Sequence, residues 1–160
     1  GIQRKAIFDY TDEGGDRDYR ILNLCLRKPK ECRSDEKGWT GEHSKELDSA
    51  LASLPHNDAG EPFWRGMYNP QLYDTFLKAK PGSTFVDPGF GSYTYNKLTA
   101  FGFATGDKRI VIVSRNKNLT PVDALSAIPS EKEAILPRGT VQTIKSVTKD
   151  KDGTLIVEVE

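Results

Sequence analysis

The sequence predicts an α+β fold in which helices pack on antiparallel sheets. Two observations support this fold class. Apolar residues recur at three- and four-residue spacings in the first half of the chain, which is typical of amphipathic helices. The second half contains short runs of β-branched and aromatic residues separated by turn residues, which is typical of strands.

Composition narrows the class of function. A chain of 160 residues is long enough to bury a sizeable core, and we expect one domain. The 23 acidic and 23 basic residues cancel, which argues against a protein that binds nucleic acid or membranes mainly through its charge. No apolar run approaches the roughly 18 residues of a membrane span. The chain begins without an initiator methionine and carries no signal-peptide pattern, so we expect a piece of a longer protein.

The cysteines and histidines form no metal-ligand spacing that we recognise, and we expect no metal site. Cys25 and Cys32 lie seven residues apart, whereas His43 and His56 are isolated. Cys25 falls in an apolar helical run and is expected in the core. A disulfide between the two cysteines is compatible with the sequence but is not required by it.

Two helices are expected before residue 55. The first covers residues 17–27, with Asp16 as its N-cap and a stop at Pro29. The charged segment 28–40 contains a glycine and is expected to be a loop. A second helix over 42–54 has an apolar stripe and ends before a proline.

An arginine follows the next apolar pair. Phe63 and Trp64 begin a strand, which we expect Gly66 to end. Arg65 would then lie at the end of a buried strand, where a guanidinium group needs an anionic partner. A structural salt bridge to one of the many acids is the alternative to a binding role. A helix over 70–79 follows, with a proline in its first turn.

The remaining chain alternates strands and turns. A helix over 96–104 would bury Leu98, Phe101 and Phe103. The polar segment 115–130 is expected to be a long loop, a type of segment that is often functional in compact domains. Strands are expected at 83–87, 90–95, 109–114, 132–136, 140–148 and 154–159. The run of apolar residues in 109–114 predicts a central strand covered on both faces, and the Asp-Gly pair at 152–153 predicts a hairpin turn between the last two strands.

Two pairs of polar residues lie two apart on expected strands and therefore share a face. Ser92 and Thr94 form one pair, and Glu131 and Glu133 form the other. Two like charges side by side are tolerated on a solvated strand edge, or in a cleft where charge is needed. The sequence leaves both interpretations of the glutamate pair open.

Three motifs in order give the chain a resemblance to a known family. They are Phe-Trp-Arg-Gly at 63–66, Gly-Phe-Gly-Ser-Tyr-Thr at 89–94, and Glu-Lys-Glu-Ala-Ile-Leu-Pro-Arg-Gly at 131–139. Together with the segments 9–11 and 19–23, they resemble the mono-ADP-ribosyltransferase superfamily, in its Arg–Ser–Glu branch of bacterial toxin type. The middle motif of that family is usually Ser-Thr-Ser, so Tyr93 is a departure. The resemblance implies a split antiparallel β-sandwich with an N-terminal helical part.

The resemblance also implies catalytic roles. Glu133 would stabilise the oxocarbenium-like transition state that forms when the bond between nicotinamide and ribose breaks. Arg65 would hold the phosphate or the adjoining ribose of NAD. Ser92 would hydrogen-bond Glu133 and position it. Glu131 would orient or deprotonate an incoming guanidinium group, since a glutamate at this position goes with arginine acceptors in the family.

Further residues are implied as binding groups for NAD, which is expected as a substrate. The backbone of Gly66 would pair with the nicotinamide amide, and Thr94 would supply the last hydroxyl of the middle motif. Either Phe101 or Tyr95 would stack on the nicotinamide ring. The loop at 121–130 resembles the segment that meets the acceptor, and Tyr93 is expected to point away from the site because strand side chains alternate.

The function implied is an NAD-dependent mono-ADP-ribosyltransferase toxin domain. Protein arginine is the favoured acceptor and RNA the second choice, because basic residues at 97, 108, 109, 115 and 117 leave a nucleic acid possible. An NAD glycohydrolase and a non-catalytic NAD-fold binding module are the alternatives, and an injected phage protein could carry the same domain. We expect residues 1–160 to be the C-terminal module of a larger protein that is secreted or injected and acts in the target-cell cytoplasm. A cognate immunity protein is expected as a partner, and a membrane is not.

Overall fold

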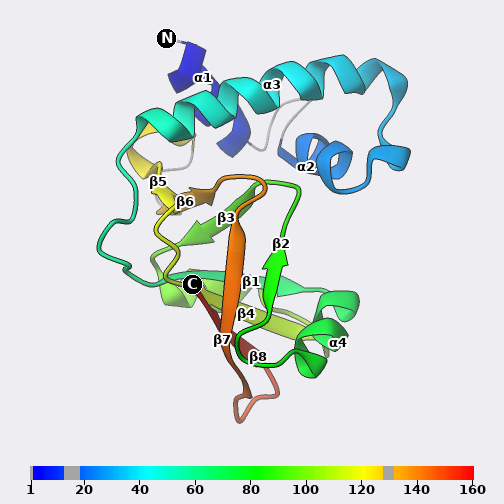
Figure 1. Ribbon diagram of the computed structural model, residues 1–160, viewed down its shortest axis with the longest axis vertical. Helices are drawn as coiled ribbons and strands as arrows, with labels where there is room; N and C mark the ends of the chain where they lie inside the picture. The colour runs from blue at the N-terminus through cyan, green and yellow to red at the C-terminus, as the bar shows by residue number, and fades with distance from the viewer. Residues whose placement is uncertain (1, 13–18, 128–131) are drawn as a thin grey trace.

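The computed structural model describes residues 2–12, 19–127 and 132–160 of the chain. Helices α1 (Ile2–Thr11), α2 (Tyr19–Arg27) and α3 (Ser34–Ser53) gather at one end of the molecule, above the strands in Figure 1. The described part of α2 agrees with the helix expected over 17–27, and its expected N-cap, Asp16, lies outside the described residues. Within the described ranges, no helix is both long enough and apolar enough to cross a membrane.

The segment 28–40 is helical, and the expectation of a loop was wrong. A short 3-10 helix, η1 (Pro29–Glu31), is followed by α3, whose first turn carries two acids that favour a helix N-terminus. The buried face of α3 begins with polar residues, Glu36, Thr40 and Ser44, and continues through Leu47 and Leu51 at helical spacing. Because the first half of that face is polar, apolar periodicity does not detect it.

The described strands form one sheet with the neighbour order β2-β7-β8-β4-β1-β3-β6-β5. The strands are β1 (Phe63–Tyr68), β2 (Thr84–Val86), β3 (Gly91–Thr94), β4 (Arg109–Ser114), β5 (Thr120–Pro121), β6 (Glu133–Leu136), β7 (Val141–Lys149) and β8 (Leu155–Val159). Strand β4 lies near the middle and is largely buried, as its sequence predicts. Neighbouring strands are antiparallel except β4 and β8, which are parallel, so the sheet is not wholly antiparallel. The direction of β8 is set by its hairpin with β7 across Asp152-Gly153.

The sheet divides between β1 and β3. Strand β1 pairs with β4 along all six of its residues but is registered with β3 only at Trp64 and Thr94. Strand β3 pairs instead with β6 along its four residues. The sheet therefore has two lobes, β2-β7-β8-β4-β1 and β3-β6-β5, that part beside the chain at residue 65, as the split sandwich requires.

Two hydrophobic cores pack against the sheet, and the larger of them contains residues from strands of both lobes. Helix α4 (Pro70–Lys78) packs Tyr73 and Phe76 on the larger lobe, together with Ile110 and Val157. Helices α1 to α3 pack on the smaller lobe, where their apolar residues surround Phe90. The N-terminal helices consequently stand directly over β3 and β6.

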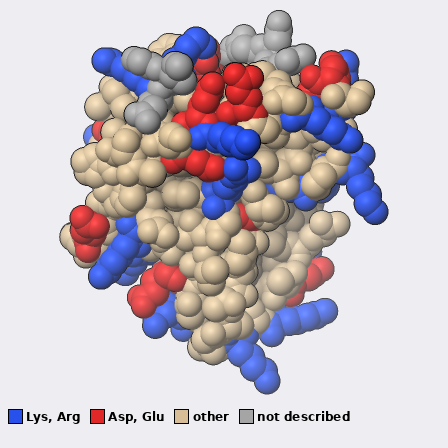
Figure 2. Space-filling model, turned by 45° about the horizontal axis from the view of Figure 1, so that its top comes forward, with Lys and Arg blue, Asp and Glu red and all other residues tan. Residues whose placement is uncertain are grey.

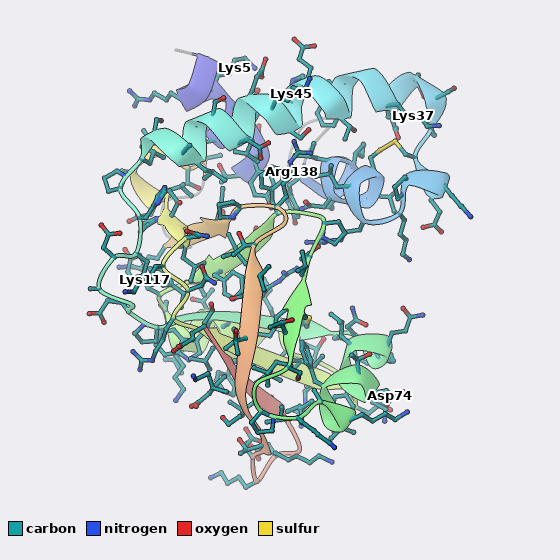
Figure 3. The ribbon with its side chains drawn as sticks, in the orientation of Figure 1. Lys5, Lys37, Lys45, Asp74, Lys117 and Arg138 are labelled. Carbon is teal, nitrogen blue, oxygen red and sulfur yellow. A yellow bond between two sulfur atoms is a disulfide. The ribbon has the colours of Figure 1, made fainter. Side chains whose placement is uncertain are left out.

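Two covalent or ionic ties fix the helical layer. A disulfide joins Cys25 at the end of α2 to Cys32, just before α3, and is the yellow bond in Figure 3. Arg138, in the turn between β6 and β7, extends toward α3, where its Nε and Nη2 atoms donate to the carboxylate of Asp48 at 3.1 and 2.7 Å. The arginine of the Pro-Arg-Gly turn therefore anchors α3 to the lobe that contains β6.

Helix α5 (Lys97–Phe103) does not bury the large apolar residues that were expected to face the core. Leu98 is 82% exposed and Phe103 is 58% exposed, whereas Ala100 is fully buried. A Cβ atom on Gly66 would lie only 1.7 Å from the carbonyl oxygen of Ala100. Because α5 approaches β1 this closely, only small residues fit at the contact, and the large side chains of α5 lie around it.

Strand β1 also continues through Gly66 to Tyr68, although Gly66 was expected to end it. Its backbone pairs with Val111 of β4, and that pairing needs no side chain. Gly66 therefore marks the close approach of α5 and not the end of the strand.

Candidate active site

A cavity of about 220 Å³ lies where the two lobes part. Helices α1 and α2 border it from the N-terminal layer, β1, β3 and β6 form its floor, and α5 closes one side. Its lining consists of Tyr10, Thr11, Tyr19, Trp64, Arg65, Gly66, Ser92, Tyr93, Thr94, Thr99, Ala100, Phe103 and Glu133. Residues from six separate helices and strands thus meet around one space.

Arg65 of β1 reaches this cavity with a side chain that is 25% exposed. Its Nη1 atom is 3.8 Å from Oδ2 of Asp87, a longer contact than those made to the same carboxylate by Arg27. Arg27 donates from Nε and Nη2 to Asp87 at 2.9 Å each, and from Nη2 to the carbonyl of Phe90 at 2.8 Å. Two guanidinium groups share one carboxylate, which leaves a local excess of positive charge suited to an anion.

Arg65 also borders two further hollows of about 290 and 340 Å³. The first lies toward α4 and the second lies along α2. A ligand too large for the 220 Å³ cavity could therefore extend past the guanidinium group of Arg65 into one of these hollows. A dinucleotide has that shape, with its pyrophosphate between two nucleosides.

Ser92 of β3 contacts the N-terminal layer. Its hydroxyl lies 3.2 Å from the hydroxyl of Tyr10, which also receives a hydrogen bond from Nδ2 of Asn23 at 3.2 Å. The Oδ1 atom of Asn23 accepts from the backbone N–H of Phe90 at 2.8 Å. Burial raises the pKa of Tyr10 above its ordinary value of 10.0. Ser92 was expected to contact Glu133, and the hydrogen bond found for it runs to Tyr10.

Glu133 begins β6 and is 8% exposed, on the lining of the cavity. It lies opposite Thr94 in the β3–β6 register, and its carbonyl accepts from the N–H of Val122 at 2.9 Å. Thr94 is also buried, and its Oγ1 accepts from the N–H of Asn96 at the start of α5. Glu131, the other expected acid, lies outside the described residues.

The aromatic residues differ from the expectation. Phe103 lines the cavity, while Phe101 is half-buried beside it with the ammonium of Lys97 5.8 Å from its ring centroid. Residue 103 is three positions from residue 100 and four from residue 99, so the three residues lie on the inner side of α5, and residue 101 is rotated away from that side. Tyr95 packs edge-on against Phe63, with ring centroids 6.1 Å apart, and is absent from the cavity lining.

Tyr93 is buried, and its hydroxyl accepts from Nε2 of Gln142 at 3.1 Å. Its ring belongs to the same core as Tyr73 and Phe76 of α4, and it also borders the cavity. The cation of Arg65 lies 5.9 Å from that ring. Burial raises the pKa of Tyr93 as it does that of Tyr10. The tyrosine that replaces a hydroxyl residue of the middle motif thus packs under the arginine.

Sequence reasoning assigned no role to Tyr10, Asn23, Arg27 and Asp87. Asn23 and Arg27 lie four apart on the polar side of an amphipathic helix, and that spacing could have identified them as a pair. Tyr10 had no comparable signal, because its partner at residue 92 is far away in the sequence.

Charges on the surface are mixed. Figure 2 shows acidic and basic side chains next to one another on the face that it presents, consistent with a net charge of zero. The local positive charge beside Asp87 is therefore a feature of the site and not of a generally basic molecule.

Comparison with known proteins agrees with this architecture. The model of the ADP-ribosyltransferase exoenzyme family matches residues 2–159. The Vis toxin of Vibrio splendidus is 20% identical with a TM-score of 0.75, covering 99% of this chain and 71% of that one. Exoenzyme S of Pseudomonas aeruginosa is 19% identical with a TM-score of 0.74, covering 99% and 72%. HopU1 of Pseudomonas syringae pv. tomato is 23% identical with a TM-score of 0.72, covering 98% and 75%. The search of curated proteins found no match.

The split sheet with its N-terminal helical layer is the fold of bacterial toxin-type ADP-ribosyltransferases. The chain belongs to the ADP-ribosyltransferase exoenzyme family, whose members are enzymes that transfer ADP-ribose from NAD.

Proposed function

We propose that residues 1–160 form a single catalytic domain that cleaves the nicotinamide–ribose bond of NAD and transfers ADP-ribose to arginine side chains of proteins. One observation carries the proposal. Arg65, Ser92 and Glu133 lie far apart in the sequence, on three strands, and line the same cavity.

Glu133 supplies the charge that the reaction needs. When the bond between ribose and nicotinamide breaks, its electron pair leaves with the nicotinamide nitrogen, and positive charge develops on the ribose. A buried carboxylate beside the ribose stabilises that charge more strongly than an exposed one, because little water screens it. The nitrogen of the acceptor then forms the new bond to the ribose carbon and loses a proton.

The two arginines hold the other end of the substrate. Arg65 binds the pyrophosphate of NAD, and Arg27 adds positive charge beside it while it holds Asp87. Asp87 in turn contacts both guanidinium groups, of which Arg65 lines the cavity and Arg27 lines the hollows beside it. A planar guanidinium group with several fixed donors suits a pyrophosphate better than a flexible ammonium group does.

Smaller groups orient the nicotinamide riboside. The backbone of Gly66 pairs with the nicotinamide amide beside the point where β1 and β3 separate, and Thr94 borders the same space. Phe103 is the aromatic side chain available to the nicotinamide ring. Tyr10 holds the hydroxyl of Ser92 in place from the helical layer.

Arginine is the acceptor that we favour. A structure of the Vis transferase holds agmatine, a small molecule that ends in a guanidinium group. In this chain, Glu131 would orient the incoming guanidinium group from the segment that precedes Glu133. Glu131→Gln should therefore suppress transfer to arginine more than hydrolysis of NAD, and an equal loss of both would count against an acceptor role.

The test determines which molecule receives the label when labelled NAD is the substrate. The domain is incubated with biotin-labelled NAD and a whole-cell lysate, and the products are divided between protease and ribonuclease treatment. Label that becomes protease-sensitive supports the proposal, and label that is ribonuclease-sensitive assigns an RNA acceptor. Free ADP-ribose alone identifies an NAD glycohydrolase, and no turnover combined with no NAD binding by calorimetry identifies a binding module. Glu133→Ala serves as the control without activity.

We also propose that the domain is the toxin module of a secreted or injected protein, acts in the target-cell cytoplasm and is neutralised in its producer by an immunity protein. Toxins and effectors among its structural relatives support this assignment. Expression of the domain in a bacterial cytoplasm should stop growth, whereas the Glu133→Ala variant should not. Equal growth of both strains would contradict the assignment.

A further inference from the structure

Tyr95, the residue after β3, connects three parts of the molecule. Its hydroxyl donates to Oδ2 of Asp123 at 3.0 Å, at the start of the 3-10 helix η2 (Asp123–Leu125). Its backbone N–H donates to the carbonyl of Lys132 at 3.3 Å, and the ammonium of Lys132 lies 5.3 Å from the centroid of its ring. Its ring also packs edge-on against the ring of Phe63 in β1.

The contact with Lys132 stabilises a strained backbone conformation. Lys132 has a φ of 52°, a left-handed conformation that costs a residue with a side chain about 1 kcal/mol or more. Glu133 follows it directly, so the direction of the chain at Lys132 sets where Glu133 begins. Tyr95 fixes that point with both its backbone and its ring.

The contact with Asp123 holds the neighbouring edge of the sheet. Strand β5 is the outermost strand beside β6, and η2 follows it. The N–H of Val122, between β5 and η2, donates to the carbonyl of Glu133 at 2.9 Å. Asp123 is the next residue, so one hydrogen bond from Tyr95 ties η2 to the same place in the site.

We propose that Tyr95 is a positioning residue for the acceptor, acting through Asp123 and Lys132 to hold the edge of the sheet against which the acceptor docks. This inference rests on the proposed function. Once NAD fills the cavity, an acceptor must reach the ribose beside Glu133 from outside that cavity. Tyr95 is 41% exposed and absent from the cavity lining, so it shapes this approach without contacting NAD.

The hydrogen bond with Asp123 raises the pKa of Tyr95. Replacing Tyr95 by phenylalanine removes the hydroxyl that donates this bond and leaves the ring for Phe63 and Lys132.

The test compares two reactions of the same protein: hydrolysis of NAD, and transfer of ADP-ribose to agmatine as the acceptor probe. Tyr95→Phe and Asp123→Ala should each lower kcat/KM for agmatine by about 2- to 10-fold, the range of one hydrogen bond. The KM for NAD and the rate of hydrolysis should stay as in the wild type. The double variant should be no worse than the poorer single variant, because both changes remove one interaction. Tyr68→Phe, at another exposed tyrosine, is the matched control and should change neither reaction.

Unchanged transfer in Tyr95→Phe would overturn the inference. So would a parallel loss of hydrolysis, which indicates a general structural role, or additive effects in the double variant. Hydrogen exchange gives a readout that is independent of turnover: the amides of Leu125 and Ser126 should exchange faster in Tyr95→Phe than in the wild type. A wild-type protein that cleaves no NAD would refute the proposed function, and equal exchange in the two proteins would separately refute the hold of Tyr95 on η2.

Discussion

The hydroxyl of Tyr10 in α1 lies 3.2 Å from the hydroxyl of Ser92 in β3, although 82 residues separate them in the chain. Asn23 of α2 joins the same phenol. The N-terminal helices are therefore part of the candidate active site and not only a cover for the sheet. A hydroxyl that is expected to act beside Glu133 is held by a helix from the opposite end of the domain.

Tyr10→Phe should weaken the enzyme while it keeps the fold. The ring remains in the core around Phe90, but Ser92 and Asn23 lose a shared partner. We expect kcat/KM for NAD to fall about 10-fold, and the free energy of unfolding to fall by about 1 to 2 kcal/mol. Steady-state release of nicotinamide and urea denaturation measure the two effects. Unchanged kcat/KM would show that Tyr10 does not position the site.

Gly66→Ala should damage both stability and binding. The new Cβ atom would meet a backbone carbonyl at 1.7 Å, and a backbone atom cannot rotate away as a flexible side chain can. We expect a loss of about 3 kcal/mol in the free energy of unfolding, at the upper end of overpacked sites, together with weaker NAD binding because α5 is displaced. Denaturation and calorimetry check these outcomes.

Gly102→Ala is the matched control for Gly66→Ala. Gly102 lies in α5, and no atom comes within 4 Å of a Cβ built there. Alanine in a helix is favoured over glycine by up to about 1 kcal/mol, so this variant should be as stable as the wild type or more stable. Similar losses in both variants would show that the close approach of α5 to β1 is not what Gly66 provides.

Removing the disulfide should loosen α2. The bridge between Cys25 and Cys32 closes a short loop, and a loop of this length contributes about 2.5 kcal/mol in the chain-entropy treatment. We expect the double variant Cys25→Ser, Cys32→Ser to lose that much stability. Its KM for NAD should rise more than its kcat falls, because α2 carries Arg27. Equal denaturation midpoints for the oxidised wild type and the variant would contradict this role.

Stability should decline in alkaline solution. Tyr10 and Tyr93 have pKa values raised by burial above the ordinary value of 10.0. In the unfolded chain both phenols ionise near that value, whereas in the folded protein they stay protonated to higher pH. The contribution of the two phenols to the free energy of unfolding is thus complete below about pH 10, and it is lost as the pH rises toward their pKa values in the folded protein. Urea denaturation between about pH 9 and about pH 11 should show the decline, and it should be smaller in Tyr10→Phe, where only one buried phenol remains.

Elements with a local signal were predicted from the sequence. The apolar run of β4, the proline at the start of α4, and the Asp-Gly turn between β7 and β8 each act within a few residues. The first turns of α3, which precede the helix expected over 42–54, were missed because their buried residues are Glu36 and Thr40, which contribute no apolar periodicity. The burial of α5 was misjudged because its contact depends on Gly66, a residue about thirty positions away.

The residues of the candidate site also fall into those that local motifs predicted and those that only the fold brings together. Arg65, Ser92 and Glu133 were singled out because family motifs surround them, and the three line one cavity. Tyr10 lies in a segment of the resemblance that carries no assigned role, and it comes to the site only when the N-terminal helices dock on the smaller lobe. Asp87 lies between β2 and β3, outside the quoted motifs, and only the fold brings it to Arg27 and Arg65. Phe101 and Tyr95 were the candidates for the nicotinamide ring, whereas Phe103 lines the cavity, because the rotation of α5 is set by its packing and not by its own sequence.

The measurement that tests the central claim most directly is the release of nicotinamide from NAD by the wild-type domain and by Glu133→Gln. This substitution removes the charge of a buried group on the cavity lining and nearly preserves its shape. We predict release by the wild type, and a decrease of about 100-fold or more in the variant at an unchanged circular dichroism spectrum, because the loss of one preorganised charge-stabilising group has effects of that size. Equal release by the two proteins would contradict the assignment of Glu133, and no release by either would contradict the proposed activity.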